Sequence, residues 1–205
     1  MDTIRIATRS MYYGTVVALI TTVNPDGSSN LAPISSVWSR SSYLVLGVGC
    51  ASQTAANLRE RRHLSVNLPS ADMWRHVEAL SGLTGREVIP GHKLSQFRFR
   101  ADKFQAAALA PEPAIFTRPV NVRGCPLQIE ATVESVREIA DQDENFLIVL
   151  ARTDSVLADE DMLNHHRTAV SPHTWDPLIF SYRTYRSLGR EAHRTGLNAP
   201  GNDDT

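Results

Sequence analysis

The sequence predicts a mainly β protein, a β-barrel with helical excursions, from three observations. Residues 16–23 are rich in β-branched side chains, which fit a pleated strand better than a helix. The turn sequence NPDG at residues 24–27 follows, where Pro presets φ at the second position and Gly accepts a positive φ at the fourth. Short apolar runs, such as residues 43–48 and 146–151, then recur along the chain with few helical segments between them.

The region after this turn is the most informative part of the chain. A hairpin partner is expected over residues 28–36, and Pro33 within it cannot donate to a ladder. This strand is therefore expected at an edge, with backbone donors left free nearby. A buried strand over residues 43–48 leads into the small-residue run GVGCAS at 47–52, where a backbone can approach a ligand closely. A helix is expected to follow over residues 54–62, capped near Ser52 or Gln53.

The rest of the chain is expected to complete the same domain. Further helices are predicted over residues 71–83, 101–109 and 159–167. Further strands are predicted over residues 63–68, 126–138 and 146–151, and residues 178–185 are expected to form a last strand or an ordered segment. The strand over 126–138 alternates apolar and polar residues, so Gln128 and Glu130 are expected on a half-exposed face. We assign residues 1–190 to a single domain and expect the polar, glycine-rich residues 191–205 to be a disordered tail.

Composition excludes several classes of protein. The chain has 205 residues, of which 42% are hydrophobic and 21% charged, as in ordinary globular domains. A formal net charge of −1 gives no basic field for nucleic acid or an anionic membrane. The apolar runs are too short to span a bilayer, and the N-terminus has no signal-like apolar segment. We therefore expect a cytoplasmic protein in which Cys50 and Cys125 are reduced and unlinked.

Two segments have the residue types of a pocket for a planar, phosphorylated ligand. The hydroxyls of Ser52 and Thr54 meet the free amides of a helix N-terminus, where the dipole favours an anion. Capping of the helix alone also explains these hydroxyls. Residues 30–38 mix small and polar side chains, so that backbone amides and the hydroxyls of Ser35 and Ser36 can bind the polar edge of a flavin ring. An ordinary polar edge strand also explains this pattern.

At these segments the sequence resembles a known family, the flavin reductase-like, FMN-binding split β-barrel proteins, which include flavoredoxin-like proteins. The blocks VVALITTVNPDGSSNLAPISS, SQTAANLRERRHLSVNL and DKFQAAALAPEPA followed by PLQIEATVESV stand in the family's order, over residues 13–161. The family motif N-x-A-P-x-S and the T-x-x-N that follows its phosphate loop are matched by Asn30, Ala32, Pro33, Ser35, Thr54 and Asn57. Relatives carry prolines where residues 12–15 and 41–42 read YYGT and SS. Because those prolines mostly stiffen loops, we expect FMN binding to be kept, while the substrate side can differ.

The resemblance implies an FMN-dependent oxidoreductase of the NAD(P)H:flavin oxidoreductase type, with one FMN per subunit and NAD(P)H as the electron donor. It also implies a homodimer and a monooxygenase as a possible partner. Hydride transfer is the chemistry of the cofactor, so no catalytic side chain is expected. The residues expected to bind the cofactor are Asn30, Ala32, Pro33, Ser35, Ser36, Val37, Ala51, Ser52, Gln53, Thr54 and Asn57.

Other interpretations of the same residues remain open at this point. The pocket could belong to an electron carrier or flavin-storage protein without reductase turnover, or to a split barrel that binds another phosphorylated ring. The histidines at 165, 166 and 173 lack the usual spacing of metal ligands, so we expect a solvated helix end rather than a metal site. A solvated helix end is also favoured for the arginines at 59, 61 and 62 over a contact with a phosphate. Arg183 and Arg186 either pack or close over the cofactor, and Trp38 and Trp74 either flank the ring or pack in a core or dimer.

Overall fold

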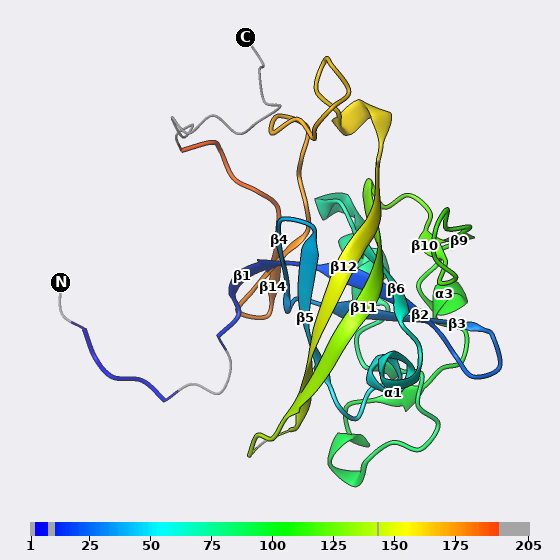
Figure 1. The fold of residues 1–205 in the computed structure, drawn as a ribbon. Coiled ribbons are helices and arrows are strands. Elements are labelled where there is room, and N and C mark those ends of the chain that lie inside the picture. The colour runs from blue at the N-terminus through cyan, green and yellow to red at the C-terminus, as the bar shows by residue number, and fades with distance from the viewer. Residues whose placement is uncertain (1–2, 8–10, 143, 193–205) are drawn as a thin grey trace.

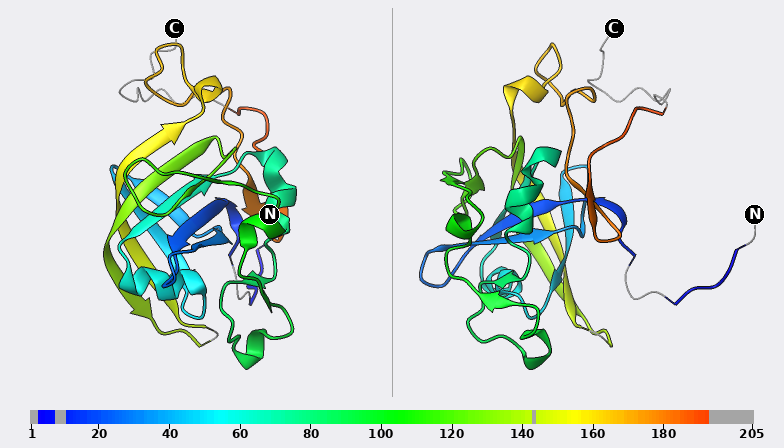
Figure 2. Two further views of the ribbon diagram at one scale, coloured as in Figure 1. Left: turned by 90° about the vertical axis from the view of Figure 1, so that its right-hand side faces the viewer. Right: turned by 180° about the vertical axis from the view of Figure 1, so that it is seen from behind.

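The computed structural model describes residues 3–7, 11–142 and 144–192. Its largest element is an antiparallel sheet of seven strands in the order β3-β2-β6-β11-β12-β5-β4. These strands are β2 (Ala18–Val23), β3 (Ser29–Ile34), β4 (Val37–Arg40), β5 (Tyr43–Gly49), β6 (His63–Leu68), β11 (Leu127–Ile139) and β12 (Phe146–Ala158). The sheet is strongly curled, as Figures 1 and 2 show. The predicted hairpin across residues 24–27 is confirmed, with Val23 opposite Ser29.

The two edges of this sheet, β3 and β4, are consecutive strands of the chain. The segment Ser35–Ser36 carries the chain from one edge to the other, and no ladder pairs β3 with β4. The barrel is therefore split along this line. The edge position that Pro33 predicted for its strand is confirmed, since β3 pairs only with β2.

The core has two parts, one on each side of β2 and β3. Ile20 faces the inside of the curled sheet, where it packs with Leu46, Val66 and Val149. Its neighbour Leu19 faces the other way, into a second cluster beneath α2 (Trp74–Glu78) and α3 (Lys103–Ala106). Strand residues alternate between faces, so burial on both sides explains why β2 is almost continuously apolar or β-branched. This double burial fixes β2, and β3 is held in place through its ladder with β2.

Shorter elements surround the sheet. The helix α1 (Gln53–Glu60) follows β5 directly. A small sheet in the order β1-β13-β14 is formed by β1 (Tyr13–Val16), β13 (Ile179–Ser181) and β14 (Thr184–Arg186). Two further strand pairs are β7 (Leu83–Thr84) with β8 (Arg98–Phe99) and β9 (Pro111–Glu112) with β10 (Asn121–Val122). Single 3₁₀ turns span Ala71–Met73, Gly91–Lys93 and Glu160–Met162. Within the described part of the chain, no helix is long and apolar enough to cross a bilayer.

Several predicted boundaries were wrong, for local reasons. The strand expected over 16–23 breaks at Val17, whose N–H donates to Leu178 O and so joins β1 to the small sheet. The helix over 71–83 is shortened to a 3₁₀ turn and α2, because the chain reverses at Gly82, where φ is +71°. The helix over 101–109 ends early, since Ala108 adopts a φ of +51°.

The predicted helix over 159–167 was also wrong beyond its first turn. Asp159 caps only the 3₁₀ turn Glu160–Met162, and Leu163 is extended. The side chain of Asn164 then accepts a hydrogen bond from Thr168 N at 2.9 Å, which holds a loop in competition with the helix. The strand over 146–151 continues instead to Ala158 along β11. Of the predicted tail, residues 193–205 lie outside the described residues.

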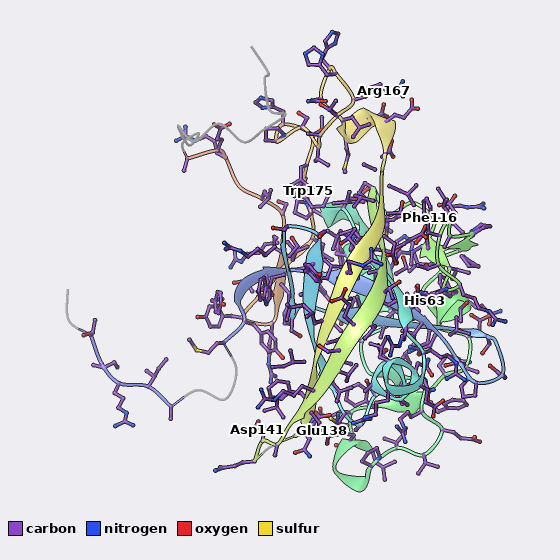
Figure 3. The ribbon with its side chains drawn as sticks, viewed as in Figure 1. His63, Phe116, Glu138, Asp141, Arg167 and Trp175 are labelled. Carbon is purple, nitrogen blue, oxygen red and sulfur yellow. The ribbon has the colours of Figure 1, made fainter. Side chains whose placement is uncertain are left out.

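Glu130 differs most from its prediction as a half-exposed strand residue. Its side chain is fully buried, at 0% exposure. One carboxylate oxygen accepts hydrogen bonds from Ile115 N (2.8 Å) and Asn121 Nδ2 (3.2 Å), and the other from Phe116 N (2.7 Å) and Thr117 N (2.9 Å). Burial alone would raise the pKa of Glu130, but these hydrogen bonds outweigh it and hold the pKa below its usual range. Glu130 thus anchors the loop that presents Phe116 at the surface on the side of β9 and β10 (Figure 3).

Replacement of this carboxylate tests the anchor. We expect Glu130→Gln to lower the free energy of unfolding by about 1–3 kcal/mol, because the amide NH₂ must face two N–H donors in either orientation. The wild-type contribution is complete above the pKa of an unfolded glutamate and is lost as pH falls through the lower folded-state pKa. Urea denaturation of both proteins between neutral and acidic pH measures both effects. The control Glu134→Gln, on the exposed part of the same strand, should change stability by less than about 0.5 kcal/mol; equal effects of the two variants would contradict the anchor.

Candidate functional site

A cavity of about 570 Å³ lies at the split in the barrel. Its wall combines the end of β3, the end of β5, the start of α1, the segment 80–97 and the β13–β14 hairpin. This volume is typical of small-molecule and cofactor sites. Most of the predicted cofactor residues line it: Ala32, Pro33, Ser35, Ser36, Ala51, Ser52, Gln53 and Thr54. The two segments that the sequence singled out therefore face one shared space.

The crossing from β3 to β4 forms the first wall of the cavity. Ser36 Oγ donates to Gly47 O at 2.9 Å, and Gly47 N donates to Ser36 O at 2.8 Å, which ties the crossing to β5. A Cβ on Gly47 would lie 3.1 Å from Ser36 Cβ, so the two strands approach this closely only with glycine there. The hydroxyl of Ser35 has no partner among the described residues and remains available to a ligand.

The start of α1 forms a second wall, which contains backbone donors without a protein partner among the described residues. Ser52 Oγ accepts a hydrogen bond from Ala55 N at 3.0 Å, so Ser52 is the N-cap. The N–H groups of Gln53 and Thr54 find no acceptor in the described residues, as is usual for the first turn of a helix. Thr54 Oγ1 accepts from Asn30 Nδ2 at 3.0 Å, which leaves the proton of this hydroxyl free to donate elsewhere. Capping and anion binding are thus compatible at this helix end.

Three predicted residues, Asn30, Val37 and Asn57, do not line the cavity. Asn30 and Asn57 are buried beneath it, and both side chains donate to Thr22 Oγ1, at 3.1 and 3.0 Å. Asn57 Oδ1 also accepts from Gln53 Nε2 at 2.9 Å. The two asparagines therefore position Gln53 and Thr54 rather than reach the cavity themselves. Val37 packs against the barrel core.

Asn30 also explains a glycine in the wall of the cavity. Its Oδ1 atom is buried without a hydrogen-bond partner among the described residues. A Cβ on Gly85, which lines the cavity, would lie 2.7 Å from this oxygen and 3.2 Å from Gln53 Cβ. The segment that carries Gly85 can therefore lie against the start of α1 only because Gly85 has no side chain. This close approach brings the segment after β7 to the same end of the cavity as Thr54.

Lys103 is a cavity residue that the sequence reasoning did not identify. It is only 4% exposed, it lines the cavity from α3, and no carboxylate within the described residues forms an ion pair with it. Burial lowers the pKa of Lys103 to about 8. The signal in the sequence was a lysine at the first position of the short helix, between the cap Asp102 and the apolar Phe104. A buried ammonium group without a counter-ion favours an anionic ligand.

The segment between β7 and β8 forms the remaining rim. Lys93 pairs with Glu144 at the end of the β11–β12 hairpin, and Phe97 lines the cavity beside it. At another part of the wall, Phe180 contacts Tyr12 and Tyr185, with ring centroids 5.2 and 5.7 Å apart. The cavity thus has polar donors near α1 and an aromatic surface near the β13–β14 hairpin.

The remaining candidates lie elsewhere. Trp38 is 58% exposed on β4, and Trp74 packs under the guanidinium of Arg75; neither lines the cavity. Arg59, near the C-terminal end of α1, pairs with Glu138 at 2.9 Å, close to the far end of β11 (Figure 3). The ring of His165 contacts His166, and nowhere in residues 3–7, 11–142 and 144–192 do His, Cys, Asp or Glu gather in a group that could hold a metal ion. Cys50 and Cys125 are not linked.

Comparison with known proteins agrees with this geometry. Residues 9–189 match the family model of the flavin reductase like domain. The chain belongs to the flavin reductase-like family. It is 36% identical over 192 residues to "Uncharacterized protein YdfE" of Bacillus subtilis (strain 168), which covers 90% of this chain and 89% of that protein.

Solved structures of other proteins share the fold. Flavoredoxin of Desulfovibrio vulgaris (Miyazaki F) superposes with a TM-score of 0.75 at 20% identity, over 95% of this chain and 98% of that one. Nitrilotriacetate monooxygenase component B from Bacillus cereus superposes with a TM-score of 0.72 at 15% identity, over 88% of each chain. The split-barrel fold that the resemblance implied is confirmed.

The buried lysine predicts an unusual dependence of stability on pH. An unfolded lysine keeps a pKa of 10.5, whereas the folded protein lowers it to about 8. Between about pH 8 and 10.5 the unfolded chain therefore binds more protons than the folded protein, and the free energy of unfolding rises as the pH rises. We expect ligand-free Lys103→Met to be more stable than wild type at pH 7, on the order of 3 kcal/mol at about 1.4 kcal/mol per pKa unit, and the gap to narrow toward pH 10.

Denaturant titrations of wild type, Lys103→Met and the control Lys93→Met over this pH range test the expectation. Lys93 sits in an ion pair with Glu144 at the rim, so its loss should give no such stabilisation. A Lys103→Met protein that is equally or less stable than wild type at pH 7 would show that the ammonium group is not strained in the cavity.

Proposed function

We propose that this protein is an FMN-dependent oxidoreductase of the NAD(P)H:flavin oxidoreductase type, which transfers electrons from a nicotinamide to flavin. The observation that carries the proposal is the single cavity that joins the free N-terminus of α1 and the buried Lys103 to the crossing between β3 and β4. Membership of the flavin reductase-like family supports the same conclusion.

The residues of the cavity fit the two ends of such a cofactor. The N–H groups of Gln53 and Thr54, the hydroxyl of Thr54 and the ammonium group of Lys103 would hold the phosphate. The buried charge of Lys103 supports this assignment, since a phosphate would supply the counter-ion that the described protein residues lack. A phosphate site of this kind would favour FMN, which has a terminal phosphate, over riboflavin.

The crossing segment would hold the ring. Its Ser35 hydroxyl and the unpaired backbone of the β3 edge provide polar groups, while Ala32 and Pro33 provide a small apolar surface. A bound flavin would supply the hydride chemistry itself. The role of the protein is to orient the ring and to exclude water. The rim between β7 and β8, which the ion pair of Lys93 with Glu144 holds at the cavity, is well placed for this role.

Addition of FMN and then NAD(P)H to the purified protein tests the function. A flavin absorption band that sharpens on binding, followed by steady oxidation of NADH or NADPH with excess free FMN, is the expected result. Bleaching of one equivalent of bound flavin without turnover would favour an electron carrier or flavin-storage protein instead. A protein that binds a different phosphorylated ring, and no flavin, would contradict both.

We also propose that the protein is a homodimer. Trp38 and Tyr43 on the edge pair β4 and β5 are exposed, and large aromatic side chains at a surface favour contact with another protein chain. Sedimentation analysis should give the mass of two chains, and a single chain at micromolar concentration would contradict this proposal.

Removal of the Thr54 hydroxyl tests the phosphate assignment. Thr54→Val keeps the volume but removes a hydrogen bond to a charged group, worth about 1.5–3 kcal/mol. We expect the Kd for FMN to rise about tenfold or more, measured by quenching of flavin fluorescence. The control Thr153→Val lies on β12, outside the cavity, and should bind FMN like wild type; an unchanged Kd in Thr54→Val would refute the assignment.

A further inference from the structure

The turn between β13 and β14 has a backbone that its residues disfavour. Ser181 pairs with Thr184, so Tyr182 and Arg183 alone form a two-residue hairpin loop. Their φ angles are +44° and +63°. A two-residue loop with positive φ at both positions normally carries Asn-Gly or a similar pair, because a side chain with a Cβ is strained there. Elsewhere in the described residues, no two consecutive non-glycine residues have positive φ.

Strain of this kind persists where the surrounding structure or a function retains it. Tyr182 is 66% exposed and does not line the cavity, so its side chain gives no evident reason for the strain. Arg183 does line the cavity, is exposed to solvent, and forms no ion pair with any described residue. The turn therefore presents one unpaired guanidinium group at the mouth of the cavity.

Arg183 belongs to a different part of the wall from the expected phosphate site. The β13–β14 hairpin lies beside β1, and Figures 1 and 2 both show it apart from α1. The aromatic side chains of Phe180 and Tyr185 line the cavity on the same hairpin. An aromatic surface next to an accessible arginine suits a planar ring that carries a phosphate. A guanidinium group at the mouth of the cavity is accessible to a ligand that enters and leaves during each reaction cycle.

We propose that Arg183 binds a phosphate group of the nicotinamide dinucleotide donor, and that the strained Tyr182–Arg183 turn is retained to place this guanidinium. The inference rests on the proposed function, because it assigns the donor of that reaction to the aromatic end of the cavity. Arg183 is thus a binding residue for the second substrate, distinct from the groups that would hold FMN.

The turn offers a matched pair of variants. Tyr182→Gly and Arg183→Gly each relieve one strained φ angle, so each should raise Tm by about 2–4 °C. Both should bind FMN with the wild-type Kd. Only Arg183→Gly should raise the Kd for NADP⁺ or NAD⁺, measured by calorimetry, and the KM for the reduced donor, each at least tenfold. Arg183→Lys should recover part of this affinity, with a stronger dependence on salt.

The two dinucleotides separate the possible contacts. A loss for NADP⁺ alone would place Arg183 at the 2′-phosphate, whereas an equal loss for both would place it at the diphosphate. Equal dinucleotide affinities in the two glycine variants would overturn the proposal. A wild-type protein that binds no FMN would instead contradict the proposed function. The dinucleotide titration of the ligand-free protein would still decide the role of Arg183. If the wild-type protein bound no dinucleotide in that titration, the proposed role of Arg183 would be overturned. Sedimentation of both variants checks that the oligomeric state is unchanged.

Discussion

The site depends on one constraint, namely that the barrel cannot close between β3 and β4. The two strands are consecutive in the chain and lie at opposite edges of one sheet, so the segment Ser35–Ser36 must cross the gap. Pro33 has no N–H to offer a partner strand. The edge of β3 is therefore left with unpaired backbone, and the chain after β5 brings the N-terminus of α1 to the same place. A cavity with polar groups on both sides is the consequence.

The groups around this cavity are held at a cost in stability. A buried hydrogen-bond network joins Thr22, Asn30 and Asn57 to Thr54 and Gln53. The side-chain oxygen Oδ1 of Asn30 has no partner among the described residues. Lys103 keeps an ammonium group in a buried position, where desolvation lowers its pKa. Unfavourable features of this kind gather where a protein binds a ligand that can compensate for them. The ligand-free protein is expected to gain stability when such a group is removed.

Pattern and turn chemistry predicted most of the fold and several residues of the cavity wall. The alternation of apolar residues located the strands, the NPDG turn fixed the first hairpin, and Pro33 marked the edge strand. The cap of α1 was expected at Ser52 or Gln53, and the small residues at the end of β5 and after it marked the loop at the cavity. These features are local, so a single sequence contains them.

The wrong or missing predictions concern residues whose surroundings come from distant parts of the chain. Glu130 looks like an exposed strand residue until the loop of residues 115–117 supplies its hydrogen bonds. Lys103 looks like a surface lysine until α3 packs beside β3 at the cavity. Asn57 follows the helix start as a ligand would, yet its amide is taken up by Thr22 and Asn24. Local pattern cannot reveal a partner that only tertiary structure provides.

The most direct test of the central claim, that one cavity holds both the ring and the phosphate of FMN, is a comparison of FMN with riboflavin on the wild-type protein. The two share the ring and differ by the phosphate, which alone would reach the helix N-terminus and Lys103. Equilibrium titrations at neutral pH should show FMN bound about a hundredfold or more tightly than riboflavin, as two charge-assisted contacts of about 1.5–3 kcal/mol each would give. Equal affinity for the two would contradict the account.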